Sequence, residues 1–188
     1  DFKDKRIFTG PPGSVAKRIL EGIIGASTGF KAGDDYTPVN LDWGSGAQAL
    51  RDGNIDVFIQ PAQLGSANVE QLSVSRDIRL IPLPPTEGNE KLTKATTNPG
   101  NMLIEIPAET YSGQVNETAV PAIALRHIAG VGIHTNEETI YQVTKAIWEN
   151  IDEFYSYGDF LKQVNPELAF VDMNVPLHAG AYRYYKEA

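Results

Sequence analysis

The fold is decided by the stretch Arg6-Ile7-Phe8-Thr9-Gly10-Pro11-Pro12-Gly13-Ser14, near the start of the chain. Its first four residues predict a short buried strand. The two prolines remove backbone donors and the glycines beside them permit a sharp turn, so the strand ends there. Ser14 is a favoured N-cap residue, and apolar residues recur behind it with helical spacing as far as Ile24. The stretch therefore predicts a strand, a tight turn and a helix.

The same alternation continues along the chain. We expect strands at 36–43, 55–59 and 78–83, and helices at 45–51 and 66–72. Strands that alternate with helices predict βαβ units and a largely parallel sheet, so the fold class is α/β. Beyond residue 86 we expect a helix at 87–96 and strands at 102–107 and 118–124. One long helix should follow at 135–154, and Thr135 with Glu138 predicts a capping box at its start. A short helix is expected around 160–161 and a last one from residue 179.

Composition excludes several classes of protein. The chain has 188 residues, no cysteine and a net charge of −8. Without cysteine there is no thiol nucleophile, cysteine zinc site, iron–sulfur cluster or disulfide. The acidic balance argues against nucleic acid as a partner, because phosphate binding needs a basic face. The longest apolar stretch, 119–125, is far too short to span a membrane.

The turn at 10–14 is the first candidate site. A strand, a tight turn and the free amides of a helix start can hold an anion, and the hydroxyl of Ser14 can donate to a carboxylate. A plain capped turn explains the same residues. Gly44–Ala49 matches a loose dinucleotide fingerprint, but the helix behind it is short and a capped helix start explains its glycines.

Two further residues are candidates for ligand contact. Gln60 follows the strand at 55–59, and ligands of parallel sheets bind at the carboxyl ends of strands. Tyr111 lies in a polar loop between two apolar runs, where it is either a ligand contact or a surface anchor. The three histidines have no metal-ligand spacing and there is no nucleophile elbow, so we expect no metal, no cofactor and no catalysis.

Five short motifs follow one another from one end of the chain to the other: 1–14, 49–58, 106–114, 141–150 and 177–187. Taken together and in this order, they resemble the TAXI family of solute receptors that serve TRAP transporters.

The resemblance implies a type II periplasmic-binding-protein fold, in which two α/β lobes close over a ligand. It implies an extracytoplasmic, periplasmic receptor that captures a small organic anion such as glutamate or a dicarboxylate and delivers it to a TRAP membrane permease. Carried over by position, Gly10, Gly13, Ser14, Gln60 and Tyr111 would form or border the ligand site, whereas His178 and Gly180 would serve structure.

The resemblance also implies an organisation into lobes. Residues 1–117 would be the second lobe, and 118–188 a hinge return strand with C-terminal helices that complete the other lobe. The family's first lobe would be missing, so we expect weak binding, a ligand-facing cation supplied by that lobe, and a helix at 140–154 that favours homodimerisation through its uncovered apolar face.

Two other readings stay open. A sensor or immunogenic surface-antigen module on the same fold would bind a ligand without transporting it. An enzyme of the same fold class, such as a deaminase or dehydratase, would turn a substrate over, although the cysteine-dependent deaminase is excluded.

Overall fold

A small parallel sheet is built around the stretch at 6–14. A computed structural model of the chain describes residues 2–97 and 100–188, so Asp1 of the first motif lies outside it. Strand β1 (Arg6–Phe8) is central, between β2 (Thr37–Pro38) and β3 (Val57–Phe58), and both pairings are parallel. Ile7 and Phe8 are completely buried. The predicted strand at 6–9 and the α/β class are therefore confirmed.

The sheet's core lies against the first helix. Ile7, Ile24 and Tyr36 form a buried cluster, and partly buried apolar residues pack around it: Phe2, Phe30, Val57 and Ile59.

At the start of β1, Arg6 forms a two-pronged ion pair with Asp56, with Nη2–Oδ1 at 2.8 Å and Nε–Oδ2 at 3.1 Å. Hydrogen bonds to the Arg6 side chain and amide lower the pKa of Asp56 from 3.8 to about 2. The ion pair thus joins the starts of neighbouring strands.

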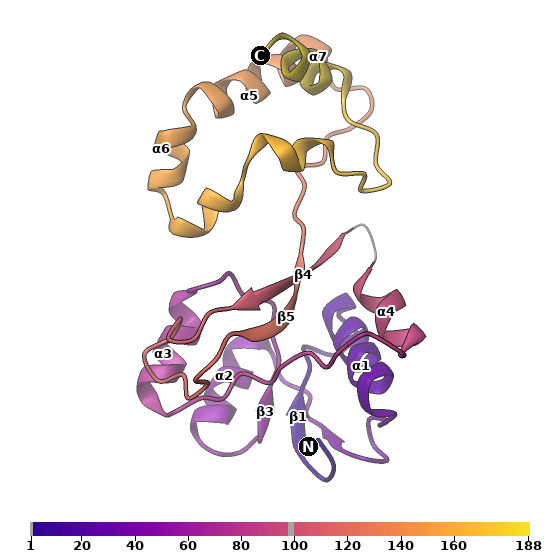
Figure 1. Ribbon diagram of the computed structural model, residues 1–188, viewed down its shortest axis with the longest axis vertical. Helices are drawn as coiled ribbons and strands as arrows, with labels where there is room; N and C mark the ends of the chain where they lie inside the picture. The colour runs from indigo at the N-terminus through magenta and orange to yellow at the C-terminus, as the bar shows by residue number, and fades with distance from the viewer. Residues whose placement is uncertain (1, 98–99) are drawn as a thin grey trace. The chain divides into compact units, whose positions relative to one another are not determined.

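Four helices accompany this sheet. They are α1 (Val15–Thr28), α2 (Trp43–Arg51), α3 (Ala67–Ser75) and α4 (Glu90–Thr96). Helix α1 begins as predicted, because the Ser14 hydroxyl accepts from the amide of Lys17, and it ends at Gly29 in the left-handed region. Helices α1 and α4 pack together on one side, and α2 and α3 on the other (Figure 1).

Two predicted strands are corrected. The strand expected at 36–43 is reduced to β2, because Asp42 is the N-cap of α2 and Trp43 is that helix's first residue. No strand forms at 78–83 in the described chain: Ile78 makes only an isolated bridge with Gln114. The backbone of Leu80 bonds instead to an amide side chain, since its N–H donates to Asn116 Oδ1 at 2.8 Å and its carbonyl accepts from Nδ2 at 3.0 Å.

A separate two-stranded sheet holds β4 (Asn101–Ile106) and β5 (Val120–Leu125), near their predicted positions. The described chain divides into two compact units, Asp1–Ala124 and Leu125–Ala188. The first unit therefore includes most of β5, which the sequence analysis placed in a returning segment from residue 118. The assignment of either unit to a receptor lobe stays a prediction.

The second unit is helical. It contains α5 (Glu137–Glu149), α6 (Ile151–Ser156), the 3-10 segments η1 (Asp159–Gln163) and η2 (Pro166–Phe170), and α7 (Ala179–Glu187). The predicted capping box is wrong by one residue, because Asn136 is the N-cap and its Oδ1 accepts from Thr139 N at 3.1 Å. The single helix predicted at 135–154 is interrupted at Asn150, where φ is −120° and ψ is 31°.

The backbones of helices α5 and α7 lie in direct contact at Gly180. A Cβ on Gly180 would lie 2.2 Å from the carbonyl oxygen of Glu137, so only glycine fits there. His178 is the N-cap of α7: its Nδ1 accepts from the amide of Gly180 at 3.2 Å, and Nε2 lies 3.2 Å from the carbonyl oxygen of Thr135. The expectation that His178 and Gly180 serve structure is confirmed.

Candidate functional site

The order of the strands places the candidate site. In the order β2-β1-β3, the chain leaves β1 toward one neighbour and later returns to its other side. In open parallel sheets, ligands bind at the carboxyl ends of the two strands where this reversal occurs. Here those strands are β1, which leads into Gly10, and β3, which leads into Gln60. The geometry thus brings the two predicted positions to one edge of the sheet.

The turn between β1 and α1 has the backbone that the sequence predicted. Gly10 has φ +121° and Gly13 has φ +75°, values that L side chains rarely adopt. The Ser14 hydroxyl accepts from Lys17 N at 3.1 Å. Among the described residues, none accepts a hydrogen bond from the amides of Val15 or Ala16, as is usual in the first turn of a helix. These amides and the positive end of the helix dipole favour an anion.

Trp43 forms a wall beside this turn. Its ring stands edge-on to Phe8, with centroids 5.4 Å apart, and a Cβ on Gly10 would lie 3.0 Å from Cη2 of the indole. Trp43 is not among the candidate residues predicted from the sequence. Its place in the site was missed because the predicted strand ran through it, and the signal that could have found it was Asp42 with Ser45, a capping pair that places Trp43 inside a helix.

Packing, and not nucleotide binding, explains the glycines of α2. A Cβ on Gly46 would lie 2.9 Å from the rings of both Phe8 and Phe58, which are stacked with centroids 5.4 Å apart. Gly44 lies beside the carboxylate of Asp42, the residue that caps the helix. The structure therefore favours the capped helix start over the dinucleotide fingerprint at 44–49.

Lys17 is the cation nearest to the turn in sequence, but an acid already balances its charge. Its Nζ lies 3.2 Å from Oε1 of Glu21 and 3.3 Å from Oδ1 of Asn40. The buried hydroxyl of Thr9 also donates to Glu21, at 3.2 Å. An anion at the turn would therefore depend on backbone amides and the Ser14 hydroxyl more than on this ammonium group.

Gln60 and Tyr111 differ in whether their side chains are free to contact a ligand. Gln60 is partly exposed, and its side-chain amide has no hydrogen-bond partner among the described residues. Tyr111 is 5% exposed, and its hydroxyl accepts from the amide of Gly65 at 3.2 Å. Burial raises the pKa of the Tyr111 phenol, so the phenol stays neutral at physiological pH. Gly10, Gly13 and Ser14 thus share one turn, Gln60 ends the adjacent strand, and Tyr111 lies beneath the loop that follows Gln60.

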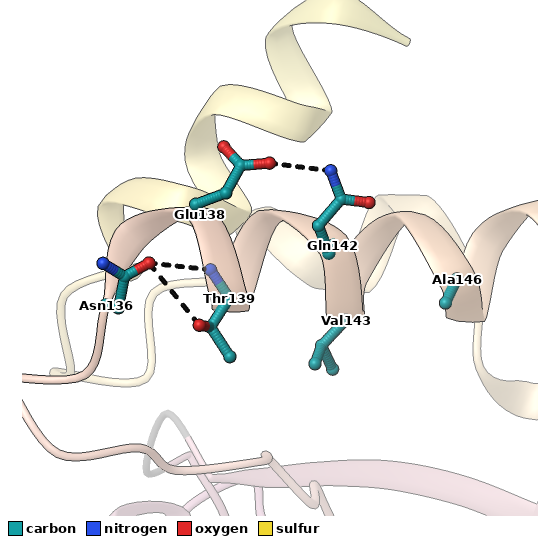
Figure 2. Close-up of a pocket in the computed structure, with 6 residues that line it drawn as sticks. All are labelled: Asn136, Glu138, Thr139, Gln142, Val143 and Ala146. Atoms are coloured by element: carbon teal, nitrogen blue, oxygen red, sulfur yellow. Dashed lines mark hydrogen bonds between the residues drawn. The ribbon is translucent and has the colours of Figure 1, made fainter.

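Other parts of the described chain show fewer features of a binding site. No group of three or more potential metal ligands occurs among the described residues. An open hollow in the second unit runs along one face of α5, where Asn136, Thr139, Val143 and Ala146 lie in a row (Figure 2). Its polar groups are occupied with one another, since Asn136 bonds to Thr139 and Glu138 accepts from Gln142. The hollow therefore lacks the convergent polar groups of a ligand site.

Comparison with known proteins agrees with this geometry. The model of the NMT1-like family matches residues 1–188, the whole chain. In the part of the chain that the structure describes, no helix combines the length and the apolar character that crossing a membrane requires. The NMT1-like family is a periplasmic-binding-protein-like family, and membership suggests a substrate-binding role. From its parallel sheet, its strand-end site and this match over its full length, the chain belongs to the NMT1-like family.

Proposed function

We propose that the protein is an extracytoplasmic solute receptor that captures a small organic anion, a glutamate-like amino acid or a dicarboxylate, for a TRAP-type secondary transporter. The observation that carries the proposal is the family match over residues 1–188, because this family resembles periplasmic binding proteins. The five TAXI-like motifs narrow the proposal from solute binding in general to this class of receptor.

The turn at 10–14 supports an anionic ligand. The amides of Val15 and Ala16 and the hydroxyl of Ser14 supply donors without a full positive charge, and the two left-handed glycines let the backbone approach a ligand closely. Trp43 adds an apolar wall beside these donors, and the amide of Gln60, which has no partner in the described part of the chain, adds a polar contact from the adjacent strand. A carboxylate in the turn with a short carbon chain against the indole fits this arrangement.

We further propose that the protein catalyses no reaction and that its macromolecular partner is the TRAP permease. The candidate site supports this view because its donors bind and orient, while no histidine is among its residues. A receptor of this kind works by differential affinity: it holds the ligand outside the membrane until the permease takes it up. Periplasmic or other extracytoplasmic location follows from this role.

Isothermal titration calorimetry with L-glutamate and with succinate tests the proposal. The protein should bind at least one of them with 1:1 stoichiometry. Ser14→Ala should weaken binding roughly ten- to 150-fold, because a hydrogen bond to a charged group contributes about 1.5–3 kcal/mol. Ser27→Ala is the matched control on the same helix, since the Ser27 hydroxyl donates only to the carbonyl of Ile24, and it should leave the affinity unchanged. Absence of binding by small organic anions at millimolar concentration would refute the proposal.

A further inference from the structure

The segment around Tyr111 is attached to the loop that follows β3. The Tyr111 ring is buried, and its hydroxyl accepts from the N–H of Gly65, which lies 46 residues away in sequence. Gly65 belongs to the loop 61–66, which joins Gln60 at the end of β3 to the start of α3. A buried phenol that accepts a backbone N–H from a distant loop fixes the position of that loop.

The residues after Tyr111 hold the segment itself against α3. Ser112 donates to Glu70 from its amide at 3.1 Å and from its hydroxyl, and these bonds lower the pKa of the Glu70 carboxyl. The amide of Gly113 donates to Ser73 Oγ at 3.3 Å, and a Cβ on Gly113 would lie 2.1 Å from the carbonyl oxygen of Ser73. Tyr111 is therefore presented to the loop from a rigid support.

Helix α3 begins just after Gly65 and has no side-chain cap. Ser66 is the N-cap, but its side chain makes no capping hydrogen bond, and its buried hydroxyl has no partner among the described residues. At α1 and α2, in contrast, the cap side chain accepts from a first-turn amide. The phenol of Tyr111 therefore holds the backbone directly before this helix, at the Gly65 amide, where Ser66 makes no side-chain bond of its own.

We propose that Tyr111 is a positioning residue of the ligand site: by holding the Gly65 amide, its hydroxyl fixes the loop 61–66 and so the orientation of Gln60, without touching the ligand. The inference rests on the proposed function and refines it, because it assigns Tyr111 a role through the loop instead of a direct contact. When the loop is already fixed, it loses less conformational entropy as a ligand binds at Gln60.

The test is Tyr111→Phe, which keeps the ring and removes only the acceptor. Amide hydrogen exchange followed by NMR should show the Gly65 N–H exchanging roughly tenfold faster, while the amides of β1 are unchanged. Affinity for L-glutamate or succinate should fall about three- to tenfold, while the lost hydrogen bond lowers the melting temperature by only a few degrees. A Gly65 amide that is unprotected in the unmodified protein, or that exchanges at the same rate in the variant, would overturn the proposal.

Two controls separate this role from others. Tyr155→Phe removes a comparable phenol bond, the one to the carbonyl of Val164 in the second unit, and should change neither Gly65 exchange nor affinity. Ser66→Ala removes a hydroxyl that has no partner among residues 2–97 and 100–188, and it should leave Gly65 protected. If the unmodified protein binds no organic anion, the proposed function fails, whereas the exchange at Gly65 still decides whether Tyr111 holds the loop. Unchanged affinity with faster exchange would show that the loop does not affect the ligand and would overturn the positioning role.

Discussion

Gly113→Ala is the substitution whose cost follows most directly from the structure. The new Cβ would lie 2.1 Å from the carbonyl oxygen of Ser73, whereas ordinary contacts begin at 3.4 Å. The obstacle is backbone and cannot rotate away, so the segment must move by more than 1 Å. That movement strains the bond from Gly113 N to Ser73 Oγ and the 2.8 Å bond from Ile78 N to the Gly113 carbonyl. Overpacking costs about 1–3 kcal/mol and each of the two lost bonds about 1 kcal/mol, so we expect a loss of about 3–5 kcal/mol.

Urea unfolding followed by tryptophan fluorescence measures this loss. The chain has two tryptophans, and a Trp148→Phe background leaves Trp43 as the reporter of the first unit. Gly22→Ala is the matched control, because Gly22 lies inside α1 with nothing within 4 Å of its Cβ position, and it should stabilise the protein by about 0.5–1 kcal/mol. A Gly113→Ala variant within 0.5 kcal/mol of its parent would refute the rigid support described for Tyr111.

Three further predictions concern stability. His178→Ala should destabilise the second unit by about 1 kcal/mol in thermal unfolding, and His178→Asn should recover part of the loss, because asparagine also caps helices. The Asp56 carboxyl has a folded pKa of about 2, below its ordinary 3.8, so its pairing with Arg6 stabilises the fold fully above pH 4 and is lost as pH falls toward 2; acid unfolding of Asp56→Asn should lack this contribution. Burial first, and then the nearby Glu21, raises the pKa of Tyr36 to about 12, so stability should fall between pH 10 and 12, and Tyr36→Phe should flatten that slope in urea unfolding at alkaline pH.

Local signals in the sequence predicted the first unit's centre well. Ser14 and Gly29 bound α1 as their residue types indicate, and the glycines at 10 and 13 adopt the left-handed backbone that a tight turn requires. These features depend on contacts between residues that are close in sequence, and such contacts can be predicted from the sequence. The strand-end position of Gln60 was also predictable, since it needs only the βα alternation and the rule for parallel sheets.

Features that depend on distant partners were not predictable. The stretch 78–83 has a β-favouring pattern, but the Asn116 side chain takes both backbone bonds of Leu80, so the pairing that Ile78 begins does not continue as a strand. Likewise, no local pattern could show that the Tyr111 hydroxyl meets the amide of Gly65, or that Gly180 lies against the backbone of α5. These contacts join residues far apart in the chain, so only the packed structure shows them.

Native mass spectrometry of the purified protein, without and with added L-glutamate or succinate, tests the central claim most directly. We expect a 1:1 complex with a small organic acid, either already present or formed on addition, and a smaller bound fraction for Ser14→Ala than for Ser27→Ala. A spectrum that shows only the unliganded mass under every condition, or an equal bound fraction in the two variants, would contradict ligand capture at the β1–α1 turn.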